Sequence, residues 1–318
     1  MNKALQIHPD ISALPLFRNA VVTIGTFDGV HTGHKQIIKQ LKEEAKHING
    51  ETVIVTFSPH PRKVVNPDAT IELLNTPEEK AALLAAEGID HLVIVPFTKT
   101  FAEQPASEYI TVFLQGRLHP QTVIIGYDHR FGKNREGNYL MLEAFSARCG
   151  FEVKEIPEKV LLETAVSSTR IRKAIAGGDI ATANALLGYD YFFEGTVVDG
   201  NKLGRTLGYP TANIQPSDPE KLIPGFGIYA VEVEVKGKRY GGMMSIGTRP
   251  TIDDSSTSVI EVNIFNFNDN IYGESVKVYM KAYLRPELKF NGLDALKDQL
   301  ALDKEDSLKI LGKQLPGE

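Results

Sequence analysis

The chain has 318 residues, 42% of them hydrophobic and 24% charged, and this length predicts two domains rather than one core. Its formal net charge of −5 argues against broad nucleic-acid binding, and no apolar run is long enough to span a bilayer. Cys149 is the single cysteine and the amino-terminal residues lack the apolar stretch of a secretory signal, so we expect a cytoplasmic protein without intramolecular disulfides.

The first half of the chain alternates short apolar runs with helical patterns. Uniformly apolar strands that alternate with helices predict a parallel, Rossmann-like sheet covered on both faces. Ligands of such sheets bind beyond the carboxyl ends of the strands, and residues 28–34 follow the first strand there. The expected strands are 21–26, 52–57, 91–96 and 122–127, and the expected helices are 35–48, a segment that starts after Thr76, 107–115 and 139–147.

The segment after the first strand reads Gly25-Thr26-Phe27-Asp28-Gly29-Val30-His31-Thr32-Gly33-His34. Two imidazoles three residues apart at a helix start can face one ligand, and the free N–H groups and dipole there favour an anion. The glycines let the backbone approach a phosphate closely. We interpret the segment as a nucleotide-phosphate site, with two alternatives: a pair of surface histidines, or a zinc site whose third ligand has no recognisable spacing.

Further polar segments are expected at the same site. Ser167-Ser168-Thr169-Arg170-Ile171-Arg172 offers helix-capping hydroxyls and a guanidinium one turn later, which could hold a polyphosphate. The alternative is an ordinary helix cap with solvated arginines. Residues 58–62 and 126–133, which include Asp128 and His129, follow two other strands at the ligand edge of the sheet.

The pattern changes near Gly188-Tyr189, so we expect domains 1–188 and 189–318. Two short helices, 168–176 and 179–187, precede this boundary. Beyond it, apolar alternation with period two and turns such as Lys236-Gly237-Lys238 predict a small antiparallel barrel or sandwich that ends in a helix over 291–311. The fold class is therefore α/β plus β, with strands expected at 192–198, 229–235, 241–246, 259–267 and 276–284.

The second half carries its own oxygen-rich motif, Gly204-Arg205-Thr206-Leu207-Gly208-Tyr209-Pro210-Thr211-Ala212-Asn213. In an extended segment Thr211 and Asn213 share one side, and their oxygens suit Mg²⁺ and phosphate. The alternative is a barrel turn with a hydrogen-bonding asparagine. No P-loop occurs in the sequence, and a loose dinucleotide fingerprint at 225–230 lacks the strand–helix unit that it requires.

Histidine is confined to the first half, because all eight histidines lie between His8 and His129. A catalytic base in the second half must therefore be Asp, Glu, Lys or Tyr. Glu261 is a candidate, since strand alternation puts it on the same face as Asn263 and opposite Ile260 and Val262. An outward, solvated glutamate is the alternative interpretation.

Taken together, these motifs resemble a known family. The segment 25–34 is similar to the His-x-Gly-His signature of nucleotidyltransferases. With Phe57-Ser58-Pro59-His60-Pro61 and Ser167–Arg172 it resembles the FAD synthetase module of bacterial bifunctional riboflavin kinase/FAD synthetases. The resemblance covers nearly the whole chain in order. It departs from the family at His129, where Phe is usual, and at Asn263, where His is frequent.

The resemblance implies that ATP phosphorylates riboflavin to FMN, and that a second ATP adenylylates FMN to FAD with release of pyrophosphate. It implies Glu261 as the base of the kinase, His31 and His34 as catalytic residues of adenylyl transfer, and Thr211 and Asn213 as residues for Mg²⁺ or another hard divalent cation. The implied nucleotide and flavin contacts are Gly25, Thr26, Phe27, Asp28, Gly33, Asp128, Ser168, Thr169, Arg172, Gly204, Gly208, Pro210, Thr211, Asn213 and Arg285.

The expected partners are the small molecules riboflavin, FMN and ATP, without nucleic acid or membrane, and the expected state is a monomer or weak homo-oligomer. Three other functions were weighed. An adenylyltransferase for another phosphate would not need the Pro-Thr-Ala-Asn segment, and a class I aminoacyl-tRNA synthetase would carry a Lys-Met-Ser-Lys-Ser-type loop. A flavin storage or sensor protein would not need the residues implied for catalysis.

Overall fold

The structure is a computed structural model, and it describes residues 4–68, 70–156, 166–200, 204, 207–249 and 257–312. The chain divides into two compact units, residues 1–168 and residues 169–318. We call them the sheet unit and the barrel unit.

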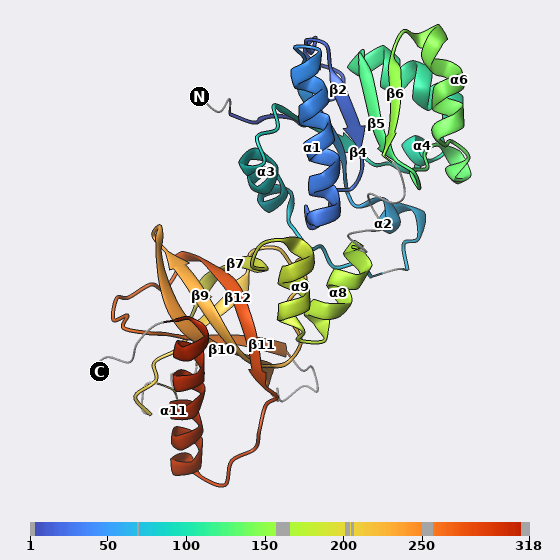
Figure 1. Ribbon diagram of the computed structural model, residues 1–318. Coiled ribbons are helices and arrows are strands. Elements are labelled where there is room, and N and C mark those ends of the chain that lie inside the picture. Colours follow the sequence, from blue (N-terminus) through green and yellow to red (C-terminus); the bar gives the residue numbers. More distant parts are fainter. Residues whose placement is uncertain are drawn as a thin grey trace. The chain divides into compact units, whose positions relative to one another are not determined.

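The sheet unit contains a parallel sheet, as the sequence predicts (Figure 1). All neighbouring strands pair in parallel. The two edge strands, β1 and β6, were missed by the sequence analysis because most of their side chains are exposed and give no continuous apolar run. In spatial order the strands are β1 (Gln6–His8), β4 (His91–Pro96), β3 (Thr52–Ser58), β2 (Val21–Ile24), β5 (Thr122–Gly126) and β6 (Glu152–Ile156).

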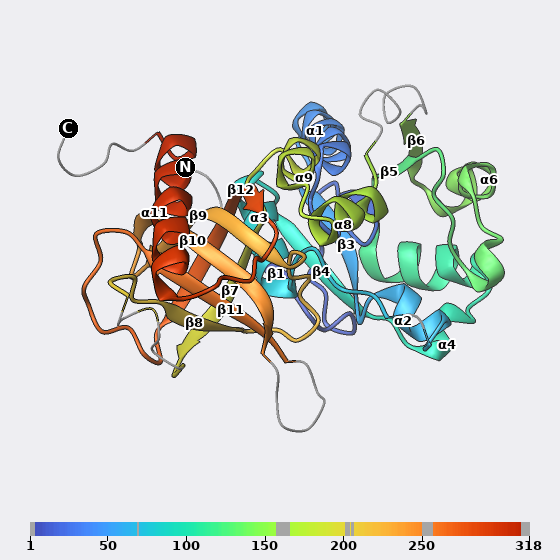
Figure 2. The same cartoon turned by 90° about the horizontal axis from the view of Figure 1, so that it is seen from below.

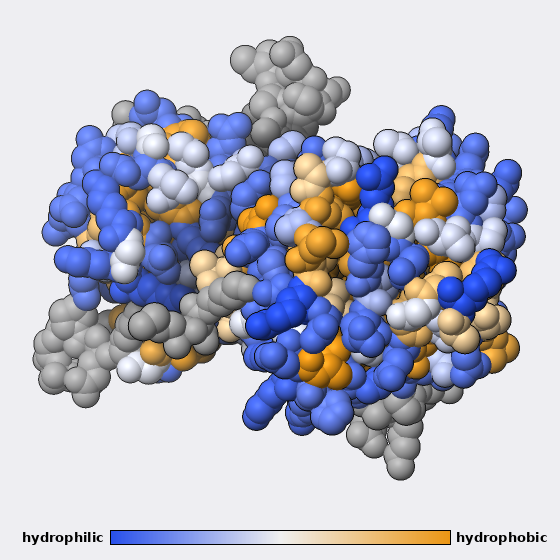
Figure 3. Space-filling model, turned by 90° about the horizontal axis from the view of Figure 1, so that it is seen from above, coloured by the Kyte–Doolittle hydropathy of each residue, from blue (hydrophilic) through white to orange (hydrophobic). Residues whose placement is uncertain are grey.

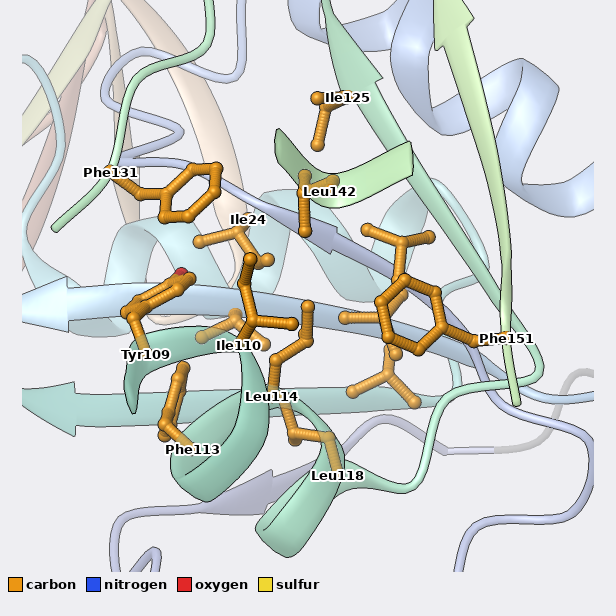
Figure 4. Close-up of a cluster of buried hydrophobic side chains, with 14 of the residues drawn as sticks. Ile24, Tyr109, Ile110, Phe113, Leu114, Leu118, Ile125, Phe131, Leu142 and Phe151 are labelled. Atoms are coloured by element: carbon orange, nitrogen blue, oxygen red, sulfur yellow. The ribbon is translucent and has the colours of Figure 1, made fainter. Parts of the chain in front are cut away.

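Helices cover both faces of this sheet. Successive residues of a strand point to opposite faces, so Val21 packs with α1 (Thr32–His47) and α3 (Pro77–Ala86), whereas Val22 packs with the helices of the other face. Figure 4 shows this second cluster, where Ile110, Leu114 and Leu118 lie against the sheet. The remaining elements of the unit are α2 (Pro61–Val65), α4 (Lys99–Ala102), α5 (Ala106–Glu108), η1 (Tyr109–Leu118), η2 (Lys133–Arg135) and α6 (Tyr139–Cys149).

One expected helix differs in type. Residues 107–115 were predicted as an ordinary helix, but the chain forms one short α-helical turn, α5, and then the π-helix η1. The wider i→i+5 turn brings Tyr109, Phe113 and Leu118 to the buried side together with Ile110 and Leu114. The sequence pattern predicts a helix here, but the packing against the sheet decides its pitch.

The barrel unit is a closed barrel, which settles the choice between barrel and sandwich. Its strands follow the order β10-β11-β8-β7-β12-β9, and β9 closes the ring by pairing with both β10 and β12. All pairs are antiparallel. The strands are β7 (Phe192–Val198), β8 (Ala212–Pro216), β9 (Gly227–Val235), β10 (Lys238–Arg249), β11 (Thr257–Ile264) and β12 (Ser275–Arg285).

A tight turn, a short strand and a terminal helix complete the barrel unit. The hairpin turn expected at Lys236-Gly237-Lys238 is present. Val235 pairs with Lys238, and the two residues between them, Lys236 and Gly237, have the positive φ values (50° and 76°) that a two-residue turn requires. β8 was missed because it is short, ends in Pro216 and follows a glycine-rich segment. The terminal helix α11 (Leu293–Ile310) is confirmed and packs against β9, β10 and β12 (Figure 2).

The helices α8 (Ser168–Ala176) and α9 (Ile180–Leu187) pack with the barrel. The Gly225 N–H donates to the Ile175 carbonyl at 3.3 Å, and the Asn184 side chain donates to the Met280 carbonyl at 2.9 Å. The boundary between the two compact units therefore lies at residue 168, earlier in the chain than the domain boundary expected near residue 188. Whether the functional domains are 1–188 and 189–318 stays a prediction.

The surface is mixed in character. Figure 3 shows, on the face in view, apolar residues in patches among hydrophilic ones. Among the described residues, no helix combines the length and the apolar character that crossing a membrane would require.

Candidate active sites

The β2–α1 turn of the sheet unit is conformationally unusual. Phe27 and Val30 have positive φ values of 46° and 35°, although both are buried and neither is glycine. A Cβ at Gly25 would come within 3.2 Å of the Phe27 ring, so the glycine leaves room for this turn. Non-glycine residues in the left-handed region persist where surrounding structure holds them, and they concentrate at functional sites. The turn delivers the chain directly to the start of α1.

His31 and His34 form a stacked pair at this helix start. Their rings lie 3.7 Å apart between centroids with 15° between planes, and the Phe27 ring lies 4.8 Å from that of His34. His31 is the N-cap: its Nδ1 accepts the His34 backbone N–H at 3.3 Å. Because Nδ1 accepts, the proton of a neutral His31 sits on Nε2, where it can be donated to a ligand.

Burial favours the neutral form of both rings. Burial lowers the pKa of His31 to about 4, with Asp28 acting in the opposite direction. Burial also lowers the pKa of His34 well below its ordinary value, and the nearby His31 and Lys80 lower it further. The His34 Nδ1 atom is buried and makes no hydrogen bond within the part of the chain that the structure describes. Among the described residues, no third His, Cys, Asp or Glu completes a metal-binding group with the two histidines.

Asp28 supports the turn from inside the protein. Its carboxylate, 1% exposed, accepts the backbone N–H groups of Leu74 (3.0 Å) and Asn75 (3.2 Å), directly before α3. Its backbone carbonyl accepts the Ser168 hydroxyl at 2.9 Å. Ser168, a predicted site residue, is therefore at the turn. Thr169 and Arg172 follow on α8 within the barrel unit, and their part in this site stays a prediction.

Sequence reasoning missed Lys80 of α3, which also reaches this turn. Its Nζ donates to the Thr26 carbonyl at 2.8 Å and lies 3.3 Å from the Thr56 hydroxyl. Burial lowers the pKa of Lys80, and Asp28 raises it. The sequence feature that could have pointed to Lys80 is that it is the single lysine in a helix with many apolar residues.

The loop after β5 begins at the same edge of the sheet, because β5 runs parallel to β2. Asp128 is exposed there. The His129 Nε2 atom is buried without a hydrogen-bond partner among the described residues, and burial lowers the pKa of this ring to about 4. The His129 ring lies 5.9 Å from that of Phe131, which stacks at 4.9 Å on Tyr109. His60, after β3, caps α2 through its Nδ1.

The barrel unit has a cavity of about 240 Å³ beside Glu261. Glu261 is half-buried on β11 and lines the cavity, while its neighbours Ile260 and Val262 are buried on the other face. Glu261 lies opposite Asn213 of β8 and Ser245 of β10 in the strand register. The barrel thus brings the predicted base next to one of the predicted cation residues.

The segment before β8 is held against β11. The Asn263 side chain donates to the Pro210 carbonyl at 2.7 Å. Asn263, which stands where the resembled family frequently has His, thus anchors the Pro210-Thr211 segment. Thr211 lines the cavity with Glu261. Asn213 is 7% exposed and packs so closely on Gly200 that a Cβ there would overlap its amide. Thr211 and Asn213 offer hard oxygen donors beside a carboxylate, which fits Mg²⁺.

The other predicted residues of this site have definite places. Gly204 lines the cavity, and Gly208 has φ +83°, a conformation that glycine adopts readily. Arg205 and Thr206 lie outside the described residues. Arg285 lines the cavity at the end of β12, paired with the buried Asp303 of α11, a residue that sequence reasoning missed.

Comparisons with known protein families match one family model to each half of the chain. A family model described as FAD synthetase matches residues 15–170, and one described as riboflavin kinase matches residues 187–311. The first covers the histidine pair and Ser168, and the second covers Thr211, Glu261 and Arg285.

Individual relatives match almost end to end. The bifunctional riboflavin kinase/FMN adenylyltransferase of Listeria monocytogenes is 40% identical over 296 residues, which is 93% of each chain. The protein of that name from Haemophilus influenzae is 38% identical over 292 residues, 91% of this chain and 94% of the relative. A crystal structure from Streptococcus pneumoniae, described as a macrolide-efflux protein, matches with a TM-score of 0.86 and 32% identity, covering 95% and 98% of the two chains. With 40% identity over 93% of its length, the chain belongs to the family of bifunctional riboflavin kinases/FMN adenylyltransferases.

Proposed function

We propose that the barrel site transfers phosphoryl from ATP to riboflavin, and that the site at the β2–α1 turn transfers AMP from a second ATP to FMN. As a family member the chain is a transferase with riboflavin kinase and FMN adenylyltransferase activities, which produces FMN and FAD. The proposal concerns which residues perform each step. It rests on the contrast between the two sites: a buried histidine pair lies at one, and a carboxylate lines a cavity at the other.

The two reactions make different demands on the protein. The riboflavin acceptor is a neutral alcohol, so a base must take its proton during phosphoryl transfer. The barrel unit contains no histidine, and Glu261 lines its cavity. Glu261 is therefore the proposed base. Arg285, at the cavity wall, is the proposed contact to phosphate or flavin, with Gly204, Gly208 and Pro210 shaping the nucleotide side.

Thr211 and Asn213 are the residues that would hold Mg²⁺ on the ATP phosphates. The bound cation would offset charge that develops on the transferring phosphoryl group. Asn263 keeps the Pro210-Thr211 segment on β11, and Gly200 leaves space for Asn213. The chain's own contribution is thus to place two oxygen donors beside Glu261.

Adenylyl transfer needs no base, because the attacking phosphate oxygen of FMN is already ionised. Catalysis then consists of positioning and of stabilising charge on the α-phosphate and the departing pyrophosphate. His31 supplies an N–H from Nε2, His34 supplies a second ring, and the start of α1 favours the anion. Gly25, Thr26, Phe27 and Gly33 shape this cradle, and Asp28 braces it. Ser168, Thr169 and Arg172 are proposed to hold the pyrophosphate, and Asp128 to line the flavin side.

The experiment separates the two activities in one chain. His34→Ala is expected to reduce FAD formation from supplied FMN by about 10²- to 10³-fold and to leave FMN formation within twofold. Glu261→Ala is expected to do the reverse, with about 10²- to 10⁴-fold loss of FMN formation. Products are followed by chromatography of the fluorescent flavins. Loss of both activities by either variant in a folded protein would contradict the assignment. A cytoplasmic location and a monomeric or weakly associated state stay predictions beside it.

A further inference from the structure

Lys80 connects three elements around the β2–α1 turn. The lysine sits on α3, its Nζ donates to the Thr26 carbonyl at 2.8 Å, and it lies 3.3 Å from the Thr56 hydroxyl of β3. That hydroxyl also donates to the Thr26 carbonyl, at 3.0 Å. One ammonium and one hydroxyl therefore converge on a single carbonyl at the entrance of the turn. A carbonyl held by two donors has little freedom to rotate, which stiffens the turn that carries His31 and His34.

Lys80 also interacts with the charged groups of the site. Asp28 raises the pKa of Lys80, and Lys80 lowers the pKa of His34. Asp28 is a buried carboxylate close to where the proposed function places a polyphosphate, and an unbalanced negative charge there would repel it. Lys80 supplies the opposite charge. Among the described residues, the charged groups that act on the pKa values of the histidine pair are Asp28 on the turn and Lys80 on α3.

Contacts that do not involve Lys80 also hold α3 in position. Thr76 and Glu79 form a reciprocal capping box at its start, with bonds of 3.1 and 3.2 Å. The Asp28 carboxylate binds the two N–H groups just before it, and Leu84 is fully buried against the sheet. The ammonium of Lys80 adds to these contacts through hydrogen bonds to Thr26 of the turn and to Thr56 of β3.

We propose that Lys80 is a positioning residue for adenylyl transfer: it fixes the β2–α1 turn through Thr26 and balances the charge of Asp28 beside the histidine pair. This inference rests on the function proposed above for that site. It adds a residue from α3, outside the His-x-Gly-His segment, to the machinery of FAD formation. The role is indirect, because the contacts of Lys80 are to Thr26 and Thr56 rather than to a reacting atom.

The test compares Lys80→Met, Lys80→Arg and the control Lys42→Met in the full chain. Lys42 is exposed, and its Nζ donates to the Glu87 carbonyl at 2.7 Å at the other end of α3, so the control removes a similar bond away from the site. For Lys80→Met we expect kcat/KM for FMN adenylylation to fall by about 10²-fold, the cost of a misplaced site. Riboflavin phosphorylation is expected to stay within twofold. Lys80→Arg, which keeps the charge, is expected to recover most of the loss, and Lys42→Met to stay within twofold.

The pH profile distinguishes positioning from mere stability. Removing the cation beside His34 raises the pKa of that ring, so the acid limb of FAD formation should move to higher pH in Lys80→Met and stay in place in Lys80→Arg. If Lys80→Met fails to fold, Lys80→Arg is the deciding variant. A folded Lys80→Arg protein that forms FAD as poorly as His34→Ala overturns the inference. Normal FAD formation by Lys80→Met also overturns it, while His34→Ala reports separately on the proposed function.

Discussion

Arg285 and Asp303 form a bidentate ion pair that joins the end of β12 to α11. Nε of Arg285 donates to Oδ1 of Asp303 at 2.8 Å, and Nη2 donates to Oδ2 at 2.6 Å. Asp303 is 3% exposed, and Gln299 donates a further bond to it at 3.0 Å. Both partners line the cavity beside Glu261, so the terminal helix forms part of the cavity that we propose as the kinase site.

Removing the charge of Asp303 should therefore damage the kinase specifically. Asp303→Asn leaves the guanidinium largely buried without its counter-charge, which costs about 3 kcal/mol of barrel stability. It should also lower riboflavin phosphorylation, because the guanidinium loses its orientation. Steady-state assays and denaturant unfolding measure both effects. Asp306→Asn, an exposed carboxylate of the same helix, is the control and should change neither. Equal loss of FAD formation from supplied FMN would contradict a role confined to the kinase.

Gly200→Ala tests the space reserved for Asn213. A Cβ at Gly200 would overlap the Asn213 amide, a short side chain that has few alternative rotamers. We expect the substitution to displace that amide and to raise the Mg²⁺ concentration needed for half-maximal riboflavin phosphorylation. The overpacking should cost about 1–3 kcal/mol. A Mg²⁺ titration of FMN formation is the measurement, with FAD formation from supplied FMN as the unaffected reference. An unchanged Mg²⁺ dependence would argue against Asn213 as a cation residue.

Gly247 and Glu287 make a similar close contact at the cavity wall. A Cβ at Gly247 would overlap the Glu287 carboxylate, but this is the end of a flexible chain that can move away. Gly247→Ala should therefore leave stability within about 1 kcal/mol. It should raise the KM of the kinase for riboflavin, because the displaced Glu287 side chain would then occupy part of the cavity that it lines. The double variant with Glu287→Ala should return KM toward the wild-type value if the overlap is the cause. Failure of that rescue would refute the steric explanation.

Mild acid should destabilise the sheet unit more than the barrel unit. The folded pKa values of His31 and His129 are about 4, against 6.5 for an unperturbed histidine. Below pH 6.5 these histidines therefore bind protons in the unfolded chain but stay neutral in the folded unit. Their contribution to the free energy of unfolding is complete above pH 6.5 and is lost as the pH falls toward 4. His31 alone accounts for roughly 3 kcal/mol of this loss. The barrel unit has no histidine.

This difference is measurable by denaturant unfolding at pH 7 and pH 5, followed by pulse proteolysis with fragments assigned to each side of residue 168. The sheet unit should unfold at lower denaturant at pH 5, and the barrel unit should change less. His129→Phe removes one of the protonation sites and should reduce the sensitivity of the sheet unit to acid. Identical pH dependence of the two units would contradict the assignment of buried neutral histidines.

Much of the fold was predictable because the local pattern is strong. The central strands of the sheet are mostly apolar and buried, and β9 of the barrel alternates with period two, so both types of sheet follow from neighbouring residues alone. The edges were not predictable: β1 and β6 expose polar side chains, and a strand of this kind is visible only once its partner is placed. The π-helical pitch of η1 also depends on the sheet that it covers.

The same division holds for the sites. Sequence by itself determined the chemistry of the short motifs: two histidines at a helix start, and oxygen donors on one side of an extended segment before a carboxylate-bearing strand. Only the tertiary structure decided that Asp28 faces the interior, that Lys80 reaches the Thr26 carbonyl from α3, and that Asp303 of α11 holds Arg285. The physical reason is separation along the chain. A motif reports what residues a few positions apart can do together, whereas a salt bridge or hydrogen bond between distant elements exists only after packing has brought them into contact.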